Sequence, residues 1–264
     1  MLKIQNVSKT FNIGTINEKK ALRNINLELA DGDFVTIIGG NGAGKSTLMN
    51  MIAGVYPIDC GHIIIDGHDV SLDTEYRRGA YIGRVFQDPM MGTASNMAIE
   101  DNLAMAKRRG QKRTLRWGIT KEEKAEYKKL LATLGLGLEE RMTSKVGLLS
   151  GGQRQALTLL MATVTKPKVL LLDEHTAALD PATSAKVLKI TNEIVTSQKL
   201  TTMMVTHDMQ EAIDLGNRLI MMFNGQIIYD VKGEEKKSLK VADLLKKFEE
   251  ASGSEFVNDR MLLK

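Results

Sequence analysis

A glycine-rich run followed by a lysine and two hydroxyl residues constrains this chain more than any other feature of its sequence. Residues 39–47 read Gly-Gly-Asn-Gly-Ala-Gly-Lys-Ser-Thr, follow the apolar run 34–38 and precede a helix-like run at 47–53. A strand, a glycine-rich loop and a helix in that order form a cradle for phosphate groups, because backbone N–H groups point inward. The sequence therefore predicts an α/β fold built around a nucleoside triphosphate site.

This loop is expected to supply the main contacts to the triphosphate. Lys45 would neutralise the β- and γ-phosphates, and the Ser46 hydroxyl would bind Mg²⁺. The predicted nucleotide contacts in this segment are Gly39, Gly40, Asn41, Gly42, Ala43, Gly44, Lys45, Ser46 and Thr47.

A second apolar run ends in two carboxylates. Residues 169–172 are Val-Leu-Leu-Leu, and Asp173 and Glu174 follow them. Ligands of open α/β sheets bind beyond the carboxyl ends of the strands. We predict that Asp173 holds Mg²⁺, directly or through water, and that Glu174 polarises the attacking water as a general base.

Composition narrows the class of protein. The chain has 264 residues, 43% of them hydrophobic, and a single cysteine, Cys60, so an intrachain disulfide is impossible. No run approaches the roughly 20 apolar residues of a membrane span, and the polar start argues against a signal peptide. The net charge of +4 does not by itself indicate nucleic-acid binding. We expect a soluble protein of a reducing compartment.

The pattern of apolar runs predicts a P-loop NTPase core with a mixed β-subdomain at the N-terminus and an inserted α-helical subdomain. Strands are expected at 2–7, 25–29, 34–38, 63–65, 81–86, 169–172, 203–206 and 219–223, and helices at 121–134, 150–165 and 182–197. One domain would span 1–230, with an α/β core at 1–87 and 168–230 and a helical subdomain at about 88–167. Residues 231–264 would form an amphipathic helix and a tail, because Val241, Leu244, Leu245 and Phe248 have helical spacing.

A second anion cradle opens the helix that leads to Asp173. Leu149-Ser150-Gly151-Gly152-Gln153 places a serine and two glycines at a helix N-terminus, with no lysine of its own. One active site does not need two cradles. The second one therefore suggests a phosphate that another copy of the chain presents.

In their order and spacing these motifs resemble those of the ATP-hydrolysing subunits of ABC (ATP-binding cassette) transporters, over about residues 1–230. The resemblance implies that Phe11 stacks on adenine, that Gln87 senses the γ-phosphate and Mg²⁺, and that His207 contacts the γ-phosphate during catalysis. It also implies that Asp180, in the turn Ala-Leu-Asp, communicates across a dimer.

The resemblance further implies a head-to-tail dimer that encloses two ATP molecules with Mg²⁺. Each ATP would lie between the P-loop of one chain and Ser150, Gly151, Gly152 and Gln153 of the other. The dimer would drive separate integral membrane subunits from the cytoplasmic face of the cell membrane, as a peripheral subunit. An importer that works with an extracellular substrate-binding protein and carries an amino acid, including aromatic ones, is the expected system.

Two other function classes remain open at this stage. One is an exporter or a lipoprotein-extracting ABC ATPase, and the other is a soluble ABC-type ATPase that acts on nucleic acid or ribosomes. Soluble members generally carry two cassettes or a long coiled-coil insertion. This chain has one cassette and no heptad run, which favours the transporter and makes nucleic acid an unlikely partner.

Two local features have more than one interpretation. His175 stands where many family members have proline, and is either a neutral turn variant or an extra proton carrier near Glu174. The basic cluster contains no acid and is a solvated loop, a contact for anionic lipid or an acidic membrane partner, or a nucleic-acid contact. Its residues are Lys107, Arg108, Arg109, Lys112, Arg113, Arg116 and the adjacent Trp117.

Overall fold

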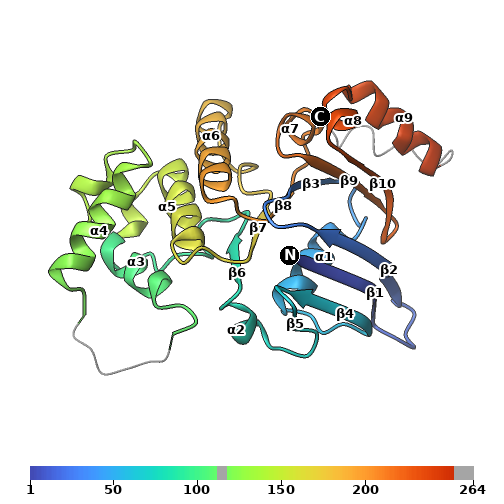
Figure 1. Cartoon of the computed structure of the whole chain (residues 1–264), viewed down its shortest axis with the longest axis horizontal. Coiled ribbons are helices and arrows are strands. Elements are labelled where there is room, and N and C mark those ends of the chain that lie inside the picture. The colour runs from blue at the N-terminus through green and yellow to red at the C-terminus, as the bar shows by residue number, and fades with distance from the viewer. Residues whose placement is uncertain (112–117, 253–264) are drawn as a thin grey trace. The chain divides into compact units, whose positions relative to one another are not determined.

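The computed structural model describes residues 1–111 and 118–252 (Figure 1). The chain forms two compact units, Met1–Arg78 with Lys199–Lys264 and the inserted Gly79–Gln198. Each unit is described by itself. The expected α/β fold, with parallel and antiparallel strands and a run of helices between them, is confirmed.

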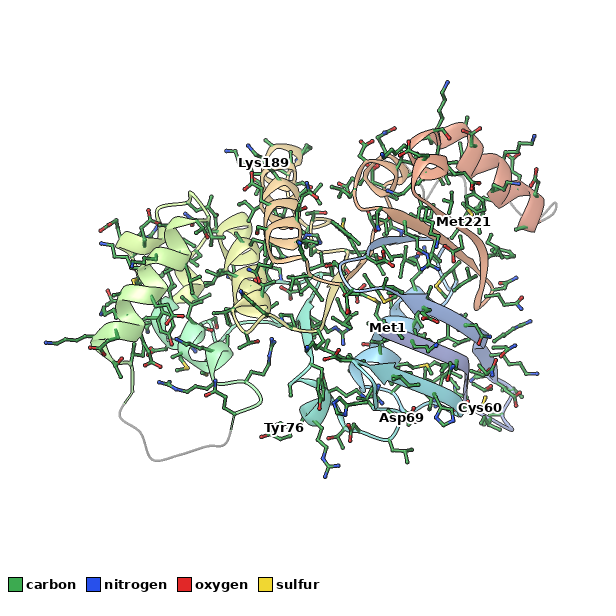
Figure 2. The ribbon with its side chains drawn as sticks, in the orientation of Figure 1. Met1, Cys60, Asp69, Tyr76, Lys189 and Met221 are labelled. Carbon is green, nitrogen blue, oxygen red and sulfur yellow. The ribbon has the colours of Figure 1, made fainter. Side chains whose placement is uncertain are left out.

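An antiparallel sheet forms one part of the first unit. Its strand order is β2-β1-β4-β5, with β1 at Leu2–Phe11, β2 at Lys19–Leu29, β4 at Cys60–Ile65 and β5 at His68–Asp69. Alternate residues such as Leu27 and Leu29 are buried while Glu28 is exposed, which is the pattern of a sheet covered on one face. The single cysteine, Cys60, is exposed on β4 (Figure 2).

A mostly parallel set of strands carries the glycine-rich loop. The strand β3 (Phe34–Ile38) lies between β8 (Thr202–Val205) and β9 (Arg218–Phe223), and β10 (Gln226–Lys232) pairs antiparallel with β9. Every residue of β3 is buried, because parallel strands are covered on both faces. The strand leads directly into the loop and the helix α1 (Lys45–Ala53).

The remaining helices of the first unit are short, apart from the last. They are α2 (Glu75–Arg78), α7 (Met209–Asp214), α8 (Glu234–Lys237) and α9 (Val241–Ser252), and the last three lie beside β9 and β10 in Figure 1. Leu244 and Phe248 of α9 are fully buried in one apolar cluster with Met209, Ala212 and Met221 (Figure 2). The C-terminal segment is therefore part of the core of this unit.

The second unit is mainly helical. Its two strands, β6 (Ile82–Val85) and β7 (Val169–Asp173), pair in parallel. The helices are α3 (Ile99–Lys107), α4 (Lys121–Ala132), α5 (Gly151–Thr163) and α6 (Pro181–Gln198), with single 3₁₀ turns at Leu138–Glu140 and Val146–Leu148. Buried side chains of α3, α4 and α5, including Leu103, Tyr127 and Leu157, form its core.

Several elements differ from the sequence expectation. The strand β2 starts at Lys19 rather than at residue 25, and its outer half, Lys-Lys-Ala-Leu-Arg, has only two apolar side chains, so no apolar run marks it. The hairpin from β9 to β10 turns through Asn224 and Gly225, which have φ values of +46° and +75°. Two successive positive φ values are typical of a type I′ turn. The helices α2, α3, α7 and α8 were also not expected.

Candidate functional site

The glycine-rich loop is shaped by two positions that admit no side chain. A Cβ atom at Gly39 would lie 2.3 Å from the Met222 carbonyl oxygen of β9. A Cβ atom at Gly44, which has a φ of +103°, would lie 2.7 Å from the Ala21 carbonyl oxygen of β2. Both glycines thus let the loop lie close against neighbouring backbone.

The side chain of Lys45 is drawn into this loop. It is only 5% exposed, and its ammonium group donates hydrogen bonds to the carbonyl oxygens of Gly39 at 2.6 Å and Gly40 at 3.2 Å. The first turn of α1 has amide donors that find no partner inside a helix, and Ser46 is exposed beside them. The amide donors of the helix start, the Lys45 charge and the exposed Ser46 hydroxyl fit the triphosphate and Mg²⁺ that the sequence predicts.

Phe11 ends β1 in the same unit. Its half-buried ring makes an edge-on contact with Tyr56, with ring centres 5.3 Å apart and planes at 80°. The Lys9 ammonium group lies 5.6 Å from the ring centre. Sequence analysis missed Tyr56, because a lone tyrosine just after a helix carries no recognisable signal.

Hydrogen bonds hold the residues that precede and follow His207. The Thr206 amide donates to the Ile37 carbonyl oxygen at 3.2 Å, which ties the segment to β3 just before the loop. The Thr206 hydroxyl donates to Glu211 Oε2 at 2.9 Å and accepts from the Asp208 amide at 3.1 Å. Asp208 in turn caps α7, since its Oδ1 accepts from the Glu211 amide at 2.9 Å.

The carboxylate of Glu211 is part of this network. Burial raises its pKa, the nearby Asp208 charge raises it further, and the Thr206 hydrogen bond opposes both. His207 itself is half-buried. The first unit thus brings the glycine-rich loop and His207 to neighbouring strands, β3 and β8.

In the second unit, two predicted residues follow adjacent parallel strands. Val85 of β6 is paired with Leu172 of β7, and Gln87 and Glu174 come two residues after each of them. Because parallel strands end at the same edge of a sheet, both residues leave the sheet there. Gln87 is exposed and Glu174 is half-buried.

The acidic end of β7 has a defined environment. Asp173 Oδ2 lies 3.6 Å from an Arg84 guanidinium nitrogen, and 16% of the Asp173 side chain is exposed. That guanidinium group also lies 4.5 Å from the centre of the Phe86 ring. Glu174 has a left-handed backbone conformation with a φ of +45°, which is uncommon for a residue with a side chain and occurs often at functional sites.

His175 is buried, and one hydrogen bond shows which of its ring nitrogens carries a hydrogen. Its Nε2 lies 3.0 Å from the Thr191 hydroxyl oxygen, whose proton is donated to the Val187 carbonyl oxygen at 2.8 Å. Nε2 therefore carries a hydrogen and donates it, while Nδ1 is buried without a partner. Burial lowers the pKa of His175 to about 4. The residue is neutral near pH 7, which favours the turn variant over the proton carrier.

Two reciprocal hydrogen bonds between Ser150 and Gln153 hold the second anion cradle. Ser150 Oγ accepts from the Gln153 amide at 3.3 Å, and Gln153 Oε1 accepts from the Ser150 amide at 3.1 Å. This capping box starts α5. Ser150 and Gly151 remain exposed, so they are the part of the cradle that an incoming phosphate can reach.

Gly152 has a different role, in packing. A Cβ atom there would lie 2.2 Å from the Thr183 methyl group at the start of α6. Asp180 caps the same helix end, accepting from the Thr183 amide at 3.1 Å. The hydrogen bonds from the Thr183 side chain and amide lower the pKa of Asp180. Thr183 has no recognisable signal in the sequence, and it packs the start of α6 closely against Gly152 at the start of α5.

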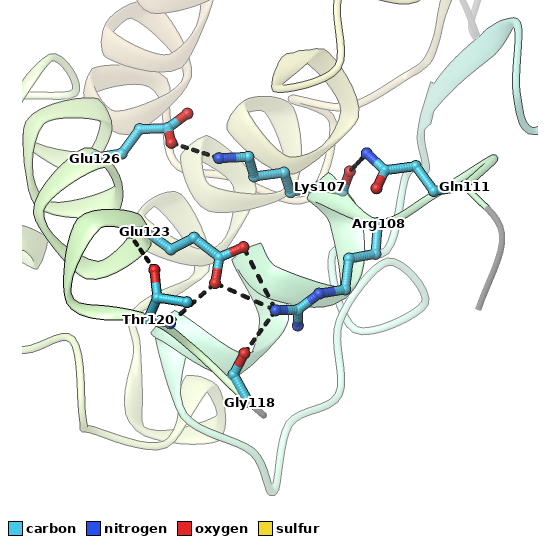
Figure 3. A network of polar contacts seen from close by, with 7 residues as sticks. All are labelled: Lys107, Arg108, Gln111, Gly118, Thr120, Glu123 and Glu126. Carbon is cyan, nitrogen blue, oxygen red and sulfur yellow. Dashed lines mark hydrogen bonds and ion pairs between the residues drawn. The ribbon is translucent and has the colours of Figure 1, made fainter. Parts of the chain in front are cut away.

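Part of the basic cluster is paired inside the second unit (Figure 3). Lys107 forms an ion pair with Glu126. Arg108 donates to the Gly118 carbonyl oxygen at 2.7 Å and lies 3.3 Å from a Glu123 carboxylate oxygen. These contacts join α3 to the start of α4.

Arg109 also makes internal contacts. It donates to the Ala162 carbonyl oxygen and to the Thr165 hydroxyl, both at 3.1 Å, and burial lowers its pKa. The other members of the cluster, Lys112, Arg113, Arg116 and Trp117, lie outside the described residues. The described part of the cluster therefore connects helices within this unit.

Two searches of residues 1–111 and 118–252 bear on ligands and membranes. No cluster of three or more His, Cys, Asp and Glu side chains there could hold a metal ion. Magnesium at a nucleotide takes one or two protein ligands together with phosphate oxygens. In the same residues, no helix combines the length and apolar character that a membrane crossing requires.

Comparison with known proteins gives consistent matches. A family described as "ABC transporter" matches residues 22–177. The tyrosine transport ATP-binding protein of Clostridioides difficile is 43% identical over 95% of this chain and 100% of its own length. The spermidine/putrescine import ATP-binding protein of Pasteurella multocida is 33% identical over 93% of this chain, which spans 63% of that relative. The methionine import ATP-binding protein of Staphylococcus aureus is 32% identical, with 86% of this chain and 64% of that protein covered.

Solved structures agree with these matches. The ATP-binding cassette MJ0796, a dimer in a post-hydrolysis state with ADP and Pi, has a TM-score of 0.75 at 28% identity and covers 88% of this chain and 98% of its own. The ADP conformation of the cassette MJ1267 has a TM-score of 0.76 at 28% identity, with 94% and 98% covered.

Proposed function

The chain belongs to the ABC transporter family, and from this premise we propose which of its residues handle ATP and what its transporter carries. As a family member it binds and hydrolyses ATP, and it energises translocation by separate membrane subunits of an import-type transporter. The residue roles and the cargo below are the proposal.

Residues of the first unit carry the proposed nucleotide-binding roles. The loop from Gly39 to Thr47 wraps the phosphates, Lys45 neutralises the β- and γ-phosphates, and Phe11 stacks on adenine. His207 contacts the γ-phosphate. The observation that carries this assignment is the loop itself, where Gly39 and Gly44 admit no Cβ atom and a buried lysine lies within reach of the cradle.

Residues that follow β6 and β7 carry the proposed hydrolytic roles. Glu174 accepts a proton from water as the water oxygen attacks the γ-phosphorus and the bond to the ADP oxygen breaks. Gln87 orients that water and senses the γ-phosphate. Ser46, Gln87 and Asp173 would hold Mg²⁺, which when bound neutralises charge that develops on the phosphate oxygens.

A second copy of the chain completes the site. Ser150, Gly151, Gly152 and Gln153 approach the ATP held by the partner, and Asp180 communicates between the copies. This assignment is supported by the exposure of Ser150 and Gly151 at a helix start and by the dimeric state of the MJ0796 cassette.

We retain the predicted organisation as part of the proposal. Residues 1–230 form the ATPase domain, with a core at 1–87 and 168–230 and a helical subdomain at about 88–167, and residues 231–264 add a helix and a tail. The protein acts at the cytoplasmic face of the membrane, bound to integral membrane subunits and served by an extracellular substrate-binding protein.

The proposed cargo is an aromatic amino acid, with tyrosine as the first candidate. Its support is the relative named for tyrosine transport, which matches over its whole length at 43% identity. The relatives named for spermidine/putrescine and methionine match at 33% and 32%.

The test begins with tagged Glu174→Gln chain, ATP and Mg²⁺, used to recover partners from detergent-solubilised host membranes. Recovery of a multi-span protein in stoichiometric amounts supports the transporter, whereas ribosomes or nucleic acid without a membrane protein would contradict it. The recovered complex, with wild-type chain in proteoliposomes, is then assayed for uptake of labelled tyrosine, spermidine and methionine. Uptake of tyrosine alone supports the cargo assignment, and uptake of spermidine or methionine alone contradicts it.

A further inference from the structure

The helix α7 starts two residues after His207 and has only six residues. A helix of this length has almost no stability of its own, because its nucleation is unfavourable in free energy and it forms few internal hydrogen bonds to offset this. Its position therefore depends on what holds its two ends. The N-terminal end is held by Asp208, Glu211 and Thr206.

The C-terminal end of α7 is held by a buried lysine from α8. Lys236 is 2% exposed, and its ammonium group donates to the carbonyl oxygens of Ile213 at 2.8 Å, Leu215 at 2.5 Å and Gly216 at 3.1 Å. An ammonium group has three N–H donors, and all three are used here. The positive charge also lies where the helix dipole is negative.

Lys236 remains a cation at neutral pH. Burial lowers its pKa to about 8, and the Asp214 carboxylate at the end of α7 opposes this shift. Charged lysines are rarely buried unless they are paired. Here three backbone carbonyl oxygens take the place of the usual carboxylate. Lys236 therefore caps the C-terminal end of α7 and is not a surface charge.

The segment that carries Lys236 is itself anchored on α7. Leu244 and Phe248 of α9 are fully buried in the same cluster as Met209 and Ala212 of α7. That cluster also contains Ile38, the residue before the glycine-rich loop. The body of α7 is thus packed under α9 while its end is capped from α8.

We infer that Lys236 is a positioning residue for His207, and that the segment 233–252 serves as a clamp on the helix that follows this histidine. The clamp fixes the C-terminal end and one face of α7, while Thr206 and Asp208 hold the other end, so that His207 keeps the backbone position from which it contacts the γ-phosphate. The inference rests on the proposed role of His207. It assigns a task to a segment beyond the residues 22–177 that the family model matches.

The test is steady-state ATP hydrolysis by the purified full chain. Lys236→Met is expected to lower kcat about tenfold and to leave the KM for ATP within about twofold, because the phosphate loop is untouched. Lys236→Gln keeps amide donors and is expected to fall between wild type and Lys236→Met, and it is the second variant should Lys236→Met not fold. Lys237→Met is the matched control, since the neighbouring lysine is exposed and pairs with Glu234, and it should leave kcat unchanged.

A double-mutant cycle distinguishes a loss of His207 positioning from a general loss of structure. In a His207→Ala background, either Lys236 variant should cause little further loss of kcat, because the group it positions is gone. Equal losses with and without His207 would overturn the inference alone, as would wild-type kcat in both Lys236 variants. Wild-type kcat in His207→Ala would overturn the proposed role of His207 and the inference with it.

Discussion

Glu174 combines a left-handed backbone with a position just beyond Asp173, and its role as general base can be tested by removing the charge alone. Glu174→Gln is expected to lower kcat about a thousandfold and to retain ATP binding, because the amide has nearly the same shape. The variant should accumulate as an ATP-bound dimer on size-exclusion chromatography. Glu193→Gln, an exposed glutamate on α6, is the control, and wild-type turnover in Glu174→Gln would contradict the assignment.

His175 makes folding stability depend on pH. Its pKa is lowered from 6.5 to about 4 in the folded chain, so the unfolded chain binds more protons between these values. Its contribution is therefore complete above about pH 6.5 and lost as the pH falls toward 4, by about 3 kcal/mol in all. Urea unfolding from pH 7 to pH 4 measures this loss.

In His175→Gln that part of the pH dependence should disappear, whereas the exposed His68→Gln should keep it. An unchanged pH profile in His175→Gln would show that His175 is not the group responsible.

The role of a residue could be predicted from the sequence where the backbone geometry permits only one residue type. Gly39, Gly44 and Lys45 belong to a motif whose spacing alone specifies a phosphate loop. Lys236 was not predictable, because a lysine in a charged segment has the same sequence signature whether it is exposed or buried. Only the three carbonyl contacts distinguish it.

At the scale of elements, the start of α5 is fitted closely against the start of α6. Gly152→Ala would place its methyl group within 2.2 Å of the Thr183 methyl group, and overpacking of this kind costs about 2 kcal/mol. We expect urea unfolding to show that loss. The double variant with Thr183→Ser, which lacks the methyl group, should regain most of it.

The neighbouring Gly151→Ala is the control. Its Cβ atom would lie 3.3 Å from a Leu179 methyl group, at the end of a flexible side chain, so its cost should be smaller. A Gly152→Ala chain that Thr183→Ser does not rescue would mean that the lost stability has another source.

Strands could be predicted from the sequence where both of their faces are buried. The strands β3 and β7 appear as continuous apolar runs, because parallel strands are covered on both faces. In the hairpin strand β10 all side chains except that of Val231 are exposed or half-buried, and α7 has too few residues to show a helical period. The sequence signal for β10 was the two-residue turn Asn224-Gly225, and the signal for α7 was its capping residue, Asp208. Both are easily overlooked.

For the whole molecule, pairing of two chains can be tested at Ser150. Ser150→Arg is expected to abolish the ATP-dependent dimer of Glu174→Gln chains, because a long cation replaces the exposed hydroxyl at the cradle. ATP binding to one chain should stay within about twofold, since the phosphate loop is unchanged. Thr143→Arg, at an exposed site nearby in sequence, is the control, and a persisting dimer in Ser150→Arg would place the contact elsewhere.

The strand that carries the phosphate loop has its pairing partners far along the chain. Residues of β3 pair with β8 and β9, as in Phe34 with Thr202 and Ile38 with Met221. During synthesis at 5–20 residues per second, Ile38 therefore waits roughly 10–40 s for Met221 to be made. A ribosome-bound chain must keep that apolar strand from aggregating throughout this interval, and the phosphate loop gains its support from β9 only after Met221 has been made.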